Sequence, residues 1–548
     1  MTPPRWLVLA AALLYVMLVG RQLDRPLMYD DANFALAARA VADTGLPFGN
    51  QGWMSERGDF SQQEQWALWH PPLYVYLLGV FAKLGGWTAA VLRLPGLLSG
   101  LASAALTYLM ARHLTRGPPA ARDVAGAVAA ILLLVCPLTV QSALIVDIDF
   151  ALLLPLTLLF VWLYLRGQPR WQLAALFALV LWTKMTNPLP LLAVIVVWQL
   201  LRGEPKGAGL DLLVIGGGGA ALFGATWLAV ATALRFPLDM PFGVNQVQWQ
   251  DSADVARRAY ASPGAFIEGL QPMVLWIGPG LVALGLAGVA IRTAQLARRW
   301  RFLKVDVLIG LLILLVLGYV NKNAGWFPKY QVALVPLLAC LAAPPLAYAW
   351  CLRPRLVLGL AESLAIGGAT VTARLVRDDW ALQRTYAIDW AAAAWLLAAL
   401  ALAMLVGVRW RAPGATVLAG LAGLSLGWSV ATAVYQSGVP YSTTYWYGTT
   451  GTREAAAWLS AQLGPGETYA AAKEVAIHTA NQRYVDQDNL LFFISSGRGF
   501  DGTWAGQPVR TVLVWQREPY VADLFAQHLP GYAEAARLGD YVVYQKSQ

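Results

Sequence analysis

Long apolar segments, separated by short polar ones, dominate the chain up to about residue 435. Since a membrane-spanning helix needs about 20 mostly apolar residues, the pattern predicts about thirteen spans. They lie near residues 5–22, 88–111, 123–143, 150–166, 170–184, 187–202, 208–233, 272–292, 305–320, 330–350, 355–373, 388–408 and 414–435. The apolar segment 71–84 is short and ends at Gly85 and Gly86, so we predict a juxtamembrane or re-entrant helix there.

The pattern changes after residue 435. The stretch "TREAAAWLSAQLG" has apolar residues at helical spacing, whereas "VRTVLVWQ" and "YVVYQK" are typical of short strands. We therefore predict a transmembrane module over residues 1–435 and a small soluble α/β domain over residues 436–548.

Composition agrees with a polytopic α-helical membrane protein. The chain is 58% hydrophobic and 13% charged, with a mean hydropathy of +0.52, whereas a soluble protein carries about 25% charged residues. The net charge of +9 needs no nucleic-acid partner, because lysines and arginines are dense in the short loops that a cytoplasmic N-terminus places inside. This orientation puts residues 23–87, residues 234–271 and the C-terminal domain outside. The chain has no Asn-x-Ser/Thr acceptor, which favours a bacterial inner membrane with a periplasmic C-terminal domain.

Ionisable residues gather at the outer ends of the predicted spans. A charge at membrane depth costs about 2.5–3.5 kcal/mol at a helix centre, so their recurrence suggests one convergent site. The candidates are Asp30 and Asp31 after the first span, His70 in "WHPPLYVYLL", Asp147 and Asp149 after the third span, Lys184 after the fifth, and Lys322 and Lys329 after the ninth.

Each candidate has a structural explanation when it is taken alone. Asp30 or Asp31 can cap the helix that follows, and Asp147 and Asp149 can be loop residues at a helix start. A lone lysine can extend its side chain to the membrane interface, and His70 can mark a helix entry before two prolines. The combination, rather than any one member, favours a site.

Carboxylates and lysines at a membrane surface suit transfer from a lipid phosphate. A carboxylate can deprotonate an acceptor hydroxyl or amine as general base. Lysines can bind a phosphate and stabilise the charge that grows on it as leaving group. A polyprenyl-phosphate carrier explains why such a site lies at the membrane edge.

The order of these motifs resembles the GT-C membrane glycosyltransferases of the protein O-mannosyltransferase and lipid A aminoarabinose transferase group, most closely the bacterial family-39-like enzymes. The resemblance covers about residues 1–350 and is strongest in "HPPLYVYLLGVFAKLGGWTAAVLRLPGLLSGLASAALTYLMARHL". It implies the GT-C fold, a polyprenyl-phosphate sugar donor and an inverting single displacement. The implied acceptor is a cell-envelope glycan, lipid A or lipopolysaccharide, or a protein.

The resemblance also implies roles for the acidic residues. Asp30 matches the first acidic position, which implies the general base, and Asp31 stands where glutamate is usual. Asp149, with Asp147 as the alternative, matches the second acidic position. A metal is not generally required, and although some relatives can carry zinc, no convincing ligand set occurs in this sequence.

The remaining candidates are expected to bind the donor. His70 matches a position near the donor phosphate, and Lys184 matches the lysine after the fifth span. Lys329 and Tyr330 stand where Arg-Tyr is common, and a lysine there keeps the charge but loses bidentate recognition. The same expectation extends to Lys322 and to Arg93 of "RLP".

Two other classes of protein compete with the glycosyltransferase. A secondary transporter often shows internal repeats and broken helices at the bilayer midplane, but no repeat is evident here and the charges lie at the outer span ends. A non-catalytic envelope-assembly protein would use the C-terminal domain to bind partners, but this reading leaves the clustered charges unexplained.

Overall fold

The computed structural model describes most of the chain. It does so outside residues 1–4, 28, 49–65, 69, 240–241, 243–256, 259, 300, 321–328, 353–418, 421, 424, 432–449, 480–482, 496–499, 505, 517–518 and 548. Up to residue 352 the described elements are helical, apart from one isolated β-bridge between Phe48 and Trp66. Beyond residue 450, helices alternate with strands.

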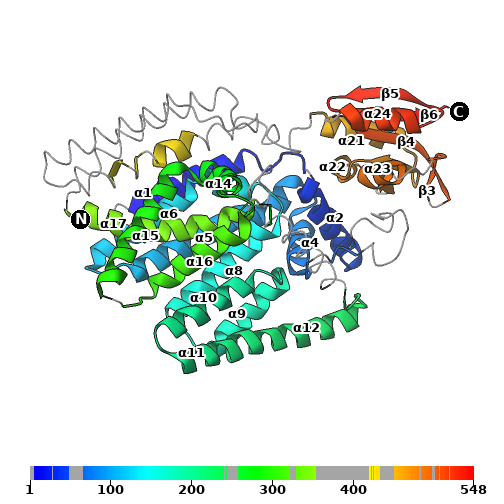
Figure 1. Ribbon diagram of the computed structural model, residues 1–548. Helices are drawn as coiled ribbons and strands as arrows, with labels where there is room; N and C mark the ends of the chain where they lie inside the picture. Colours follow the sequence, from blue (N-terminus) through cyan, green and yellow to red (C-terminus); the bar gives the residue numbers. More distant parts are fainter. Residues whose placement is uncertain are drawn as a thin grey trace.

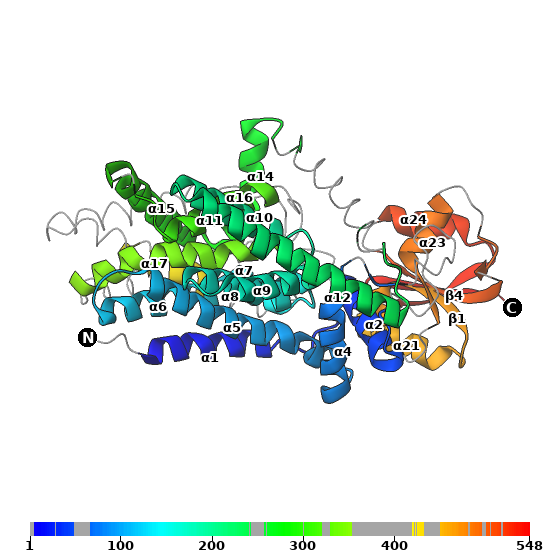
Figure 2. The same cartoon turned by 90° about the horizontal axis from the view of Figure 1, so that it is seen from below.

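Helices that run side by side form the larger part of the molecule (Figures 1 and 2). Their bounds are α1 (Arg5–Gly20), α5 (Ala89–Leu114), α6 (Pro119–Leu134), α7 (Pro137–Ala143), the π-helix η1 (Asp149–Leu153), α8 (Leu154–Leu165), α9 (Arg170–Thr183), α10 (Pro188–Leu201), α11 (Pro205–Leu210), the π-helix η2 (Asp211–Gly217), α12 (Gly218–Leu234), α14 (Pro263–Ile277), α15 (Pro279–Arg299), α16 (Val305–Tyr319), the 3-10 helix η3 (Lys329–Ala333) and α17 (Leu334–Leu352). Each of the first ten predicted spans therefore coincides with a helical segment.

Fewer described helices are long enough to span a membrane than the sequence predicts. Four described helices are long and apolar enough to cross a bilayer, namely Ala89–Leu114, Pro205–Leu234, Gly280–Arg298 and Lys329–Cys351. The pair α6 and α7, bent by 60°, adds a fifth if it counts as one span. The structure thus supports a polytopic helical membrane protein, but a total of about thirteen spans is not confirmed. The predicted spans 355–373 and 388–408, and most of 414–435, lie outside the described residues.

Helix breaks at proline place polar residues at one end of the bundle. Pro137 begins α7 and Pro188 begins α10, as expected for a residue that suits the first helical turn because it has no N–H to donate. Between α9 and α10, Lys184 adopts an extended backbone that ends α9. The break therefore places a short polar link, in which Lys184 is buried, between two apolar helices.

The segment between α1 and α5, which the sequence predicts to be the first outer loop, has two packed helices among its described residues, α2 (Tyr29–Thr44) and α4 (Leu73–Gly85). With 13 residues, α4 is too short for an ordinary span. Figure 2 shows that it runs across the direction of α5. The structure thus confirms a short helix at residues 71–84, and its juxtamembrane or re-entrant placement stays a prediction.

The C-terminal domain is a small α/β unit, as predicted, although the predicted boundary near residue 436 lies outside the described residues. Its helices are α21 (Thr452–Gln462), α22 (Lys473–Ala476), α23 (Gln487–Ser495) and α24 (Pro519–His528). Its strands are β1 (Thr468–Ala471), β2 (Tyr484–Asp486), β3 (Thr503–Trp504), β4 (Gln507–Trp515), β5 (Tyr532–Leu538) and β6 (Tyr541–Lys546). The sheet has the order β2-β1-β4-β6-β5, in which β1 is parallel to β2 and β4, while β6 is antiparallel to β4 and β5.

The C-terminal domain contacts the segment between α1 and α5 directly. Leu27 and residues of α2 share one apolar cluster with Val475 and Ile477. Arg453 pairs with Asp24 at 3.1 Å. The backbone N–H of Leu27 donates to Nε2 of His478 at 3.1 Å, so this histidine acts as an acceptor in its neutral form.

His478 is expected to make the stability of the protein sensitive to acid. Burial, reinforced by Arg453 and Arg93 and opposed by Asp24, lowers the pKa of His478 to about 4. Because an unfolded histidine titrates near 6.5, its stabilising contribution is complete above about pH 6.5 and is lost as the pH falls towards 4. The loss amounts to at most about 1.4 kcal/mol per pH unit. Thermal unfolding in detergent from pH 7 to pH 4 measures it. His478→Gln, which keeps an acceptor but does not titrate, should show a shallower decline, and equal declines would contradict the prediction.

Candidate functional site

Four of the predicted site residues meet where the ends of α7, η1, α9 and η3 converge. Nζ of Lys184 lies 2.7 Å from Oδ1 of Asp149, and both side chains are 7% exposed. Nζ of Lys329 forms an ion pair with Oδ2 of Asp147. The backbone N–H of Asp149 donates to Oδ1 of Asp147 at 2.8 Å, which links the two pairs. Two carboxylates and two ammonium groups thus form one charge-balanced cluster.

Tyr330 lies between the two lysines. Its ring centroid is 4.6 Å from Nζ of Lys184 and 5.3 Å from Nζ of Lys329. A cation over an aromatic face is attracted by the negative face of the ring. Tyr330 therefore helps to hold both ammonium groups beside the carboxylates.

The lysines keep Asp147 charged in spite of its burial. Burial raises the pKa of this carboxyl, but the ammonium groups of Lys329 and Lys184 outweigh burial, so that its net pKa lies below the ordinary value. A buried charge persists when an opposite charge neutralises it.

Asp31 belongs to a second buried pair, with Arg93. Nη2 of Arg93 lies 3.0 Å from Oδ2 of Asp31, and the other oxygen of Asp31 accepts from the backbone N–H of Val146 at 2.8 Å. Since Val146 precedes Asp147, this bond ties α2 to the loop that carries the acidic cluster.

The guanidinium of Arg93 is fully engaged by protein atoms. Besides Asp31, its acceptors are the backbone oxygens of Leu144 at 2.7 Å, Leu23 at 2.9 Å, Pro26 at 3.0 Å and Arg25. These five acceptors match its five N–H groups. Direct contact between Arg93 and a substrate, as expected from the sequence, would require one of these bonds to break.

Three other predicted site residues are placed less fully. Asp30 lies in the first turn of α2, but its side chain is not among the described parts of the structure. Lys322 also lies outside the described residues. His70 precedes Pro71 and α4 and is partly buried. Their roles stay predictions.

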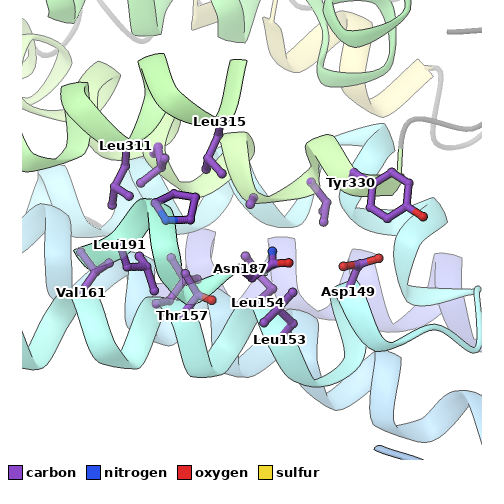
Figure 3. A pocket seen from close by; sticks show the side chains of 15 residues that line it. Asp149, Leu153, Leu154, Thr157, Val161, Asn187, Leu191, Leu311, Leu315 and Tyr330 are labelled. Carbon is purple, nitrogen blue, oxygen red and sulfur yellow. The ribbon is translucent and has the colours of Figure 1, made fainter. Parts of the chain in front are cut away.

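A pocket opens beside the acidic cluster (Figure 3). Asp149 and Tyr330 lie at one end, and Val161, Leu191 and Leu311 lie at the other. The polar residues Asn187 and Thr157 interrupt an otherwise apolar lining. Its free volume is about 40 Å³, so an isoprenoid chain could enter only if side chains of α10 or α16 moved apart.

Sequence reasoning overlooked Tyr74, which also belongs to this region. Its side chain is 1% exposed, and its ring packs edge-on against Phe34 with centroids 5.2 Å apart. Asn187 and Thr157 were overlooked as well. The sequence did contain a signal for these residues, namely an uncharged polar side chain within an apolar helical segment. A search for charged residues does not detect this signal.

Comparisons with known proteins agree with this architecture. Residues 69–216 match the protein family described as Dolichyl-phosphate-mannose-protein mannosyltransferase. ArnT from Cupriavidus metallidurans bound to undecaprenyl phosphate has a similar structure, with a TM-score of 0.59 and 18% identity over 98% of this chain and 97% of that chain. Its apo form gives a TM-score of 0.55, with the same identity and coverage.

A second similar structure comes from an archaeon. It is the oligosaccharyltransferase AglB from Archaeoglobus fulgidus in complex with an inhibitory peptide and a dolichol-phosphate, with a TM-score of 0.51 and 14% identity over 99% of this chain and 74% of that chain. The search of curated proteins gave no match. The family match and the shared GT-C fold confirm the resemblance inferred from the motifs.

Proposed function

We propose that this GT-C fold membrane protein is a glycosyltransferase that moves a sugar from a polyprenyl-phosphate carrier to an acceptor at the outer face of a bacterial inner membrane. The observation that carries the proposal is the pair of buried aspartates, each matched by a lysine, at the helix ends of a bundle with this fold. Similar folds bind undecaprenyl phosphate in ArnT and a dolichol-phosphate in AglB. The acceptor is a glycan, a lipid or a protein.

Lys184 and Lys329 supply the anion-binding part of the proposed site. An incoming lipid phosphate would take over the ammonium groups from Asp149 and Asp147, because hydrogen bonds between an ammonium and a phosphate are charge-assisted. The bond between the anomeric carbon and the phosphate oxygen then breaks, and its electron pair stays on the phosphate. The two ammonium groups stabilise that charge where it develops.

Asp30 is the proposed general base. The acceptor hydroxyl or amine attacks the anomeric carbon from the side opposite the phosphate, so the configuration inverts, and its proton passes to the carboxylate. The first turn of α2 carries Asp30, and its neighbour Asp31 is held in place by Arg93. We therefore assign Asp31 and Arg93 to positioning this turn.

The cluster favours a reaction without a divalent metal. Both carboxylates of the cluster, Asp147 and Asp149, face an ammonium group. Within the described residues, no group of three or more His, Cys, Asp and Glu side chains has an arrangement that could hold a metal. Among these residues the donor set does not fit a metal site, so the proposed reaction uses none.

Treatment with EDTA is accordingly expected to leave sugar transfer unchanged, because lysines provide the positive charge at the phosphate. The measurement is the transfer rate of the purified protein before and after chelation and dialysis. A loss of activity that one added divalent ion restores would contradict this expectation.

Mass spectrometry tests the proposed function itself. Envelope lipids and glycoproteins from cells that lack the protein should miss one sugar and accumulate its polyprenyl-phosphate form. Identical profiles with and without the protein would overturn the proposal. Solute uptake by proteoliposomes without any transfer would indicate a transporter instead.

A further inference from the structure

Tyr74 carries a hydroxyl group whose burial is not offset by a protein partner. The side chain is 1% exposed, and its hydroxyl makes no hydrogen bond to any residue that the structure describes. A buried polar group without a partner loses its hydrogen bonds to water and gains none in return. Such groups are infrequent in folded proteins, and each calls for an explanation.

Three other tyrosines of the described chain have hydrogen-bond partners for their hydroxyl groups. The Tyr15 hydroxyl donates to the backbone oxygens of Gly96 and Leu97, and Tyr469 bonds to Thr479 at 2.6 Å. Tyr76, two residues along the same helix, donates to the backbone oxygen of Gly45 at 2.8 Å. The difference between Tyr74 and Tyr76 therefore does not come from the helix that carries them.

The position of Tyr74 explains what its hydroxyl can reach. Its ring packs against Phe34, one turn beyond Asp31 on α2. Tyr74 also belongs to the same buried cluster as Val146 and Ile148, the residues that flank Asp147. Tyr74 thus lies where α4, α2 and the loop that carries Asp147 pack together.

The neighbouring carboxylates already have donors. The oxygens of Asp147 accept from Lys329 and from the N–H of Asp149, while those of Asp31 accept from Arg93 and from the N–H of Val146. Neither carboxylate accepts from the Tyr74 hydroxyl in this arrangement, which leaves that hydroxyl as a donor for a ligand.

We propose that Tyr74 donates a hydrogen bond to an oxygen of the phosphate of the lipid-linked donor. This inference rests on the proposed function and adds a neutral donor to the two lysines. A phosphate fits better than a sugar hydroxyl because Tyr74 packs with Val146 and Ile148 around Asp147, the partner of the proposed phosphate ligand Lys329. An anion bound there turns an unpaired hydroxyl into a charge-assisted donor.

Tyr74→Phe tests the proposal because it removes one oxygen atom and keeps the ring against Phe34. The probe is undecaprenyl phosphate in nanodiscs, and its binding to the purified protein is measured by native mass spectrometry. We expect binding about 10- to 100-fold weaker, as for the loss of a hydrogen bond to a charged group. Tyr76→Phe on the same helix is the matched control and should bind as the unmodified protein does.

Thermal unfolding separates this role from a structural one. Loss of an unpartnered buried hydroxyl should leave the Tm of Tyr74→Phe equal or higher, whereas a tyrosine that holds the fold together would lower it. Weak binding together with a lowered Tm would therefore overturn the proposal.

Three further outcomes also test the proposal. Equal binding and equal transfer by Tyr74→Phe and the unmodified protein would overturn this inference and leave the proposed function standing. Normal binding of undecaprenyl phosphate with reduced transfer would place the contact on the sugar or the acceptor, against the phosphate. If the unmodified protein does not bind undecaprenyl phosphate, the proposed function fails together with this inference.

Discussion

Lys184→Met is expected to lower the free energy of unfolding by about 3–5 kcal/mol, because it leaves the buried carboxylate of Asp149 without its partner. The same change removes one ammonium group from the proposed phosphate site. Thermal unfolding in detergent measures the first effect, and binding of undecaprenyl phosphate measures the second.

The double variant Lys184→Met with Asp149→Asn separates these two effects. Removal of both charges should restore most of the lost stability, because no uncompensated ion remains, while binding of the lipid phosphate should stay weak. Lys83→Met, at an exposed lysine of α4, controls for the loss of a positive charge. Single and double variants that unfold at the same temperature would show that the ion pair is not the cause.

Asp30→Asn is expected to reduce sugar transfer by about 10²- to 10⁴-fold, the usual contribution of a general base. The change is nearly isosteric, so the amount of protein in the membrane and its binding of undecaprenyl phosphate should be unaffected. The donor for the transfer assay is the polyprenyl-phosphate sugar that accumulates in cells that lack the protein.

Asp43→Asn provides the matched control, since Asp43 is an exposed carboxylate near the end of the same helix α2. It should transfer at the normal rate. Normal transfer by Asp30→Asn would remove Asp30 from the role of base and leave Asp149 as the remaining acidic candidate.

The meeting of acidic and basic residues was predictable from the sequence because apolar helices must run the length of the bundle. Polar residues at the same end of successive helices then gather at one end of the bundle. The residues that do so are Asp147, Asp149, Lys184 and Lys329. Which lysine pairs with which aspartate was not predictable. That choice depends on the bend between α6 and α7 and on contacts between residues far apart in the chain.

Arg93 and Tyr74 show a second limit of the sequence. Both lie in or near the stretch that carries the family resemblance, but neither role follows from its pattern. The five acceptors of Arg93 come mostly from backbone oxygens, which every residue supplies and no sequence pattern marks. Likewise, the isolation of the Tyr74 hydroxyl appears only after all its neighbours are in place.

The contact between Leu27 and His478 has a consequence for biosynthesis. Leu23, Arg25 and Pro26 supply backbone acceptors to Arg93. The neighbouring Leu27 bonds to His478, 451 residues further along the chain. A ribosome makes the C-terminal domain, which carries His478, after the helices around Arg93. In a nascent chain, this segment is therefore bound on the Arg93 side only. A product that terminates before His478 never forms the hydrogen bond between Leu27 and His478.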